Sequence, residues 1–84
     1  MDEIKINAGS LGEVLRATRG AARMSGREVA AAMGVSNGVI SLWERNISEP
    51  SVMHFVSWAE ATGQDPAALL RTVIAARDRG AAVA

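Results

Sequence analysis

Apolar side chains recur along the chain at the three- and four-residue spacing of amphipathic helices, while strand-like alternation is limited to residues 4–6. This spacing predicts five helices: over 11–22, between Ser25 and Gly34, over 37–45, between Ser51 and Gly63, and from Pro66 to about Arg79. The side chains expected to face the core are Leu11, Val14, Leu15, Thr18, Val29, Ala30, Met33, Val39, Ile40, Trp43, Val52, Phe55, Val56 and Ala59, with Trp58 and Thr62 at the border of this set.

Residues that begin and end helices stand beside these apolar groups. Residues 10–13 and 25–28 are capping boxes, in which a serine hydroxyl and a glutamate side chain three residues later satisfy backbone N–H groups. The other expected N-caps are Ser36, Ser51 and Asp65, and the glycines expected to end helices are Gly34 and Gly63. We therefore expect an all-α domain of five helices over 10–79, with an N-terminal arm over 1–9 and a frayed tail over 80–84.

The charges are balanced overall but segregated along the sequence. The chain has 84 residues, enough for one domain, and its nine basic and nine acidic side chains give a formal net charge of zero. Residues 16–27 contain four arginines and no acid, whereas residues 28–70 contain five acids and one arginine. One edge of the molecule is therefore expected to be positive, and a polyanion responds to that local field rather than to the net charge.

The composition removes most of the chemistry that an enzyme or a metal site needs. The chain has no Cys and no Tyr, and its one histidine, His54, has neither a second metal ligand of its kind nor an evident orienting partner. We therefore expect no enzymatic activity, no metal, no cofactor and no small-molecule ligand. The longest apolar run, over 29–33, is far shorter than the ~20 residues that span a membrane. With an acidic N-terminus and no cleavable signal, the expected location is the cytoplasm.

A short glycine-containing turn joins the second and third predicted helices. Gly34, Val35 and Ser36 form this three-residue connection, which is the geometry of a helix-turn-helix. The small side chain of Ala30 would let two helices cross closely at this turn.

Residues 11–70 resemble the Cro and phage-repressor type of helix-turn-helix domain, the XRE family, and the motif covers 26–45. The matching positions are Ala30 and Gly34, the core residues Val29, Val35, Ile40 and Trp43, the run Trp43, Glu44 and Arg45, and the pair Pro50 and Ser51. The resemblance implies a five-helix, phage-repressor-like fold that binds double-stranded DNA with its third helix in the major groove. Gly26 and Leu42 depart from it, since the family often carries Gln and a basic residue at these two positions.

The start of the third helix offers side chains suited to a duplex. Asn37 can pair bidentately with adenine, and Gly38 lets the backbone approach. The residues expected at base edges are Asn37, Gly38, Ser41 and Leu42, and those expected at phosphates are Ser25, Arg27, Ser36, Arg45, Asn46 and Ser48. For Arg45 the alternative is a structural pair with Glu49 or Glu13.

The last helix carries more apolar surface than a short chain can cover. We expect a homodimer through Leu70, Val73, Ile74 and Arg77, which would present two recognition helices to a near-palindromic operator. The alternative packing folds Val73 and Ile74 back onto the first helix.

The favoured function is a small dimeric phage or bacterial repressor. The alternative, favoured by the neutral charge and the absence of Arg, Lys and Gln from 37–44, is an antitoxin or interaction module whose main partner is a protein.

Overall fold

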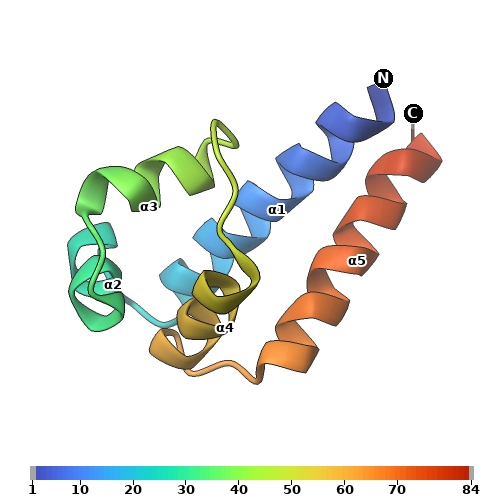
Figure 1. The fold of residues 1–84 in the computed structure, drawn as a ribbon. Coiled ribbons are helices and arrows are strands. Elements are labelled where there is room, and N and C mark those ends of the chain that lie inside the picture. Colours follow the sequence, from blue (N-terminus) through green and yellow to red (C-terminus); the bar gives the residue numbers. More distant parts are fainter. Residues whose placement is uncertain (1, 84) are drawn as a thin grey trace.

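The computed structural model describes residues 2–83, and describes the side chains of residues 11–80. These residues form five helices and no strand: α1 (Asp2–Ala21), α2 (Gly26–Met33), α3 (Asn37–Glu44), α4 (Val52–Ala61) and α5 (Pro66–Val83). α2 and α3 lie together on one side of α1, and α5 lies antiparallel to α1 on its other side (Figure 1). The expected all-α class with five helices is confirmed.

The expected cap residues of α2, α3, α4 and α5 begin these helices where their chemistry predicts. Ser25 and Glu28 form a complete capping box at the start of α2, and Ser36 and Ser51 each accept a hydrogen bond from the backbone of the following turn. Asp65 does the same for α5, since its carboxylate accepts from the N–H of Ala68 at 2.9 Å. Local side-chain to backbone bonding therefore fixes most of the helix boundaries.

The core lies where α1, α2, α3, α4 and α5 converge. Its fully buried side chains are Trp58, Leu15, Ile40, Leu69 and Val29. The Trp58 indole N–H donates to the Thr18 hydroxyl at 3.1 Å, and that hydroxyl donates to the Leu15 carbonyl at 2.9 Å. The indole nitrogen of Trp58 therefore has a hydrogen-bond partner, and this bond connects α4 to α1.

Both ends of the helical domain extend beyond the expected bounds. α1 begins at Asp2, so residues 2–9 are helical rather than an arm, and Ser10 lies inside the helix instead of capping it. α5 continues to Val83, so the expected frayed tail is helical as far as the structure describes it.

The buried face of α4 is rotated from the expected one. Trp58, Ala59 and Thr62 are buried, whereas Val52, expected in the core, is 79% exposed. Val52 is the first residue of the helix, directly after the Ser51 cap, and the side chains that enter the core come from later turns. An apolar residue at a helix start fits the periodicity without having a neighbouring helix to cover it.

Candidate nucleic-acid interface

α2 and α3 are joined by the tight turn that the sequence predicts. Gly34 adopts the left-handed conformation with φ of 72°. The N–H of Val35 then donates to the Ala30 carbonyl at 3.0 Å, which closes the end of α2. Buried Val29, Ala30 and Ile40 fill the angle between the two helices. The pair is therefore held rigidly, with the start of α3 projecting from the body of the molecule.

The N-terminal half of α3 presents an exposed polar surface. Asn37, Gly38 and Ser41 are exposed, and Leu42 is half-buried at the flank. Arg45, at the end of the same helix, donates from Nε to the Ser41 hydroxyl at 3.1 Å. The structure thus brings the four expected base-contacting residues together on one accessible helix face, and Arg45 lies against this face instead of pairing with Glu49 or Glu13.

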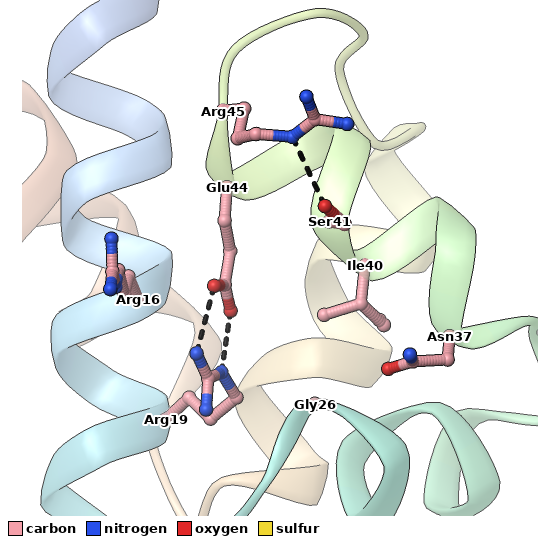
Figure 2. A pocket seen from close by; sticks show the side chains of 8 residues that line it. All are labelled: Arg16, Arg19, Gly26, Asn37, Ile40, Ser41, Glu44 and Arg45. Carbon is pink, nitrogen blue, oxygen red and sulfur yellow. Dashed lines mark hydrogen bonds and ion pairs between the residues drawn. The ribbon is translucent and has the colours of Figure 1, made fainter.

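A groove of about 310 Å³ runs between this face, α1 and the start of α2 (Figure 2). Its lining residues are Arg16, Arg19, Gly26, Asn37, Ile40, Ser41, Glu44 and Arg45. Three arginines face one carboxylate here, so the groove carries a net positive charge although the chain as a whole is neutral. Arg16 was not among the expected contact residues. It lies on α1, across the groove from the end of α3 (Figure 2).

Arg19 and Glu44 form a bidentate ion pair inside the groove. Arg19 Nε and Nη2 donate to the two Glu44 carboxylate oxygens at 2.6 and 2.9 Å, and Nη1 donates to the Met24 carbonyl at 3.1 Å. The side chains are 21% and 10% exposed. The hydrogen bonds to Glu44 raise the pKa of the Arg19 guanidinium, against the opposing effect of partial burial. The pair fixes α1 to the end of α3, a contact that helical periodicity could not reveal.

The residues expected at phosphates near the start of α2 and α3 are all exposed, but Ser25 and Ser36 also cap these helices. Arg27 is exposed at the start of α2 and makes no ion pair with any described residue. Ser25 and Ser36 use their hydroxyl oxygens to accept from the backbone, which leaves each hydroxyl proton able to donate outward. Glu28, however, places its carboxylate on the Ser25 N–H at 2.8 Å, which weakens the attraction of the α2 start for an anion.

Asn46 holds the loop after α3 against α1. Its Oδ1 accepts the N–H of Gly12 at 3.0 Å, and its backbone is left-handed with φ of 61°. A Cβ atom at Gly12 would lie 2.5 Å from the Glu44 carbonyl oxygen, so only glycine permits this approach. Asn46, which we expected at a phosphate, is thus half-buried in an internal contact, while Ser48 is exposed in the same loop.

Trp43 is buried in the core and contacts the exposed ring of His54 at a centroid distance of 5.3 Å. Within the part of the chain that the structure describes, no three potential metal ligands lie together. No helix among the described residues is long and apolar enough to cross a bilayer.

Comparison with known proteins finds one family model and two solved structures that are similar to this chain. Residues 15–69 match a helix-turn-helix family, HTH_3. One crystal structure of the clp gene regulator ClgR from Corynebacterium glutamicum is 32% identical, with a TM-score of 0.82, over 90% of this chain and 81% of that one. A second ClgR structure is also 32% identical, with a TM-score of 0.74, over 82% of this chain and 90% of that one. No curated protein sequence matches the chain significantly.

Proposed function

Because the chain belongs to the helix-turn-helix family HTH_3, whose domains bind DNA, we propose that it is a sequence-specific transcription regulator that reads double-stranded DNA through α3. The observation that carries the proposal is the exposure of Asn37, Gly38 and Ser41 beside a groove lined by three arginines. An α-helix fits the major groove, where side chains at its N-terminal end meet base edges. The similar structures are those of a gene regulator, which supports a regulatory role. Such a protein works in the cytoplasm.

Base and phosphate contacts are assigned to different parts of this surface. Asn37 pairs with adenine, Ser41 donates or accepts at a base edge, and Leu42 meets a thymine methyl group. Arg27 and Arg45 bind phosphates, with the hydroxyls of Ser25, Ser36 and Ser48 as further donors. Asn46 supports these contacts indirectly, because its amide holds the loop that carries Ser48.

The regulator acts as a homodimer, with the role of a small repressor of phage or bacterial type. Leu70 and Ile74 are 50% and 38% exposed on α5, and Leu70 borders an apolar groove of about 280 Å³ with Val52 and Phe55. Val73 packs against the core, and Arg77 bonds to Asp78 at 3.1 Å. Leu70 and Ile74 are therefore the principal apolar contributors to the dimer contact.

The salt dependence of duplex binding tests this function. If each subunit of a dimer makes about three to five phosphate contacts, log K against log salt should have a slope of roughly −5 to −9. A flat line would show that the positive groove does not meet a phosphate backbone. Analytical ultracentrifugation at the same protein concentrations gives the number of subunits to which the slope applies.

A protein partner is the second candidate, and the exposed apolar residues at the start of α4 favour it. Val52, which lines the same apolar groove, is 79% exposed, and the adjacent Met53 is 72% exposed. An antitoxin or interaction module of this fold would bind the product of an adjacent gene tightly through this face. Co-purification with that product, together with no enrichment of any duplex sequence, would replace the regulator proposal with this one.

A further inference from the structure

Gly26 of α2 and the side chain of Asn37 line the same groove. Gly26 occupies the first position of α2 and lines the groove from below, and the Asn37 amide points over it (Figure 2). A Cβ atom built on Gly26 would lie 3.0 Å from Asn37 Oδ1 and 3.7 Å from the Ile40 side chain. The first of these contacts is tighter than ordinary packing allows, so any larger residue here has to displace a neighbour.

The neighbour that gives way is the amide of Asn37. Ile40 is almost completely buried and held by the core, and its 3.7 Å separation already allows ordinary contact. The terminal torsion of an asparagine side chain is broad and soft, so its amide can rotate away at little cost. Gly26 has no left-handed backbone angle that would require glycine, since only Gly34 and Gly63 among the described glycines have positive φ. The backbone fold therefore does not require glycine at position 26. The observed orientation of the Asn37 amide does require it, because a Cβ atom would occupy the adjacent space.

We propose that Gly26 is a positioning residue for base readout, which leaves open the space in which the Asn37 amide lies over the start of α2. This inference rests on the proposed function, because it assigns to Gly26 the orientation of the group that reads adenine. Bidentate pairing requires the amide plane to meet the base edge in register, so a rotated amide loses discrimination without losing phosphate contacts. Residue 26 thus influences specificity although it touches no base.

The test compares Gly26→Ala with Gly20→Ala. Gly20 is an exposed glycine of α1 with no atom within 4 Å of a built Cβ, so its variant controls for the general effect of adding a methyl group to a helix. On the duplex that the wild type selects from a random pool, Gly26→Ala should bind about five-fold or more weakly, while binding to random duplex stays unchanged. Gly20→Ala should behave as wild type on both duplexes, and neither variant should lower the thermal midpoint.

Two further measurements make the inference refutable. In an Asn37→Ala background, Gly26→Ala should cause no additional loss, because the group it displaces is gone. A full loss in that background overturns the positioning role.

In the free protein, Gly26→Ala should shift the Asn37 side-chain NH₂ resonances in an isotope-labelled NMR spectrum, and unshifted resonances overturn the inference without any DNA. A wild type that selects no sequence overturns the proposed function as well. A wild type that selects a sequence, with a Gly26→Ala variant that selects the same one equally well, overturns the inference alone.

Discussion

Asn37 and Arg27 are both exposed at helix starts, but their side chains suit different parts of a duplex. An amide presents a donor and an acceptor in one plane, which matches the N6 and N7 atoms of adenine. A guanidinium is a fixed positive charge that bonds equally well to phosphates of any sequence. The two residues should therefore separate specificity from affinity.

Replacing Asn37 with alanine should affect specific binding alone. The variant loses both hydrogen bonds to the base in each half-site, so affinity for the selected duplex should fall by about 1–3 kcal/mol per half-site, while affinity for random duplex changes little. Competition binding with the two duplexes measures the difference. Equal losses on both would mean that Asn37 contacts the backbone.

Replacing Arg27 with alanine should weaken binding to both duplexes by similar factors. The removed charge contacts phosphate once in each subunit of the dimer, so the slope of log K against log salt should become less steep by about two units. Titrations at several salt concentrations measure both quantities. A loss confined to the selected duplex would reassign Arg27 to base contact.

The Arg19–Glu44 ion pair should stabilise the fold, because two donors of Arg19 bond to one charged carboxylate. Glu44→Gln keeps the shape of the side chain but removes the charge that two Arg19 donors share. Because hydrogen bonds to charged groups are stronger than neutral ones, the free energy of unfolding should fall by about 1–3 kcal/mol. Urea denaturation measures this change, and an unchanged midpoint would show that solvent replaces the pair at no cost.

The contact between α1 and the loop after α3 depends on the absence of a side chain at Gly12. Gly12→Ala would force its Cβ against the Glu44 carbonyl oxygen and break the approach that Asn46 secures. We expect a loss of about 1–3 kcal/mol from overpacking. Gly20→Ala is the matched control, since an alanine in an open helical position should raise stability by about 0.5–1 kcal/mol. Thermal unfolding of the two variants should therefore shift in opposite directions, and a Gly12→Ala variant as stable as its control would contradict the close approach.

The features that were predictable from sequence are mostly those fixed by neighbouring residues, although the local pattern at Ser10 and Glu13 wrongly predicted a helix start inside α1. The Ser25–Glu28 box, the Ser36 and Ser51 caps and the Gly34 turn depend on bonds within a few residues, and each is found where its pattern places it. Contacts between distant segments were not predictable. The Arg19–Glu44 pair and the Gly12–Asn46 bond join residues 25 and 34 positions apart. The exposure of Val52 likewise depends on which turns of α4 pack against the other helices, which periodicity within α4 cannot report.

At the scale of the whole molecule, a neutral chain carries a positive groove beside its exposed helix. The net charge is zero, yet Arg16, Arg19 and Arg45 line the same groove with Glu44. Arg16 and Arg45 are exposed there, while Arg19 is held in its ion pair. Local charge therefore governs the encounter with DNA, and this explains how a protein with a near-neutral isoelectric point can serve as a duplex-binding regulator.

Selection of bound sites from a random duplex pool tests the central claim most directly. A dimer that reads DNA through α3 should enrich a near-palindrome with half-sites about 10 base pairs apart, one helical turn. Within each half-site an adenine should be fixed by Asn37, and the Asn37→Ala variant should lose enrichment at that position. A pool that stays unenriched after repeated rounds would contradict sequence-specific recognition by this helix.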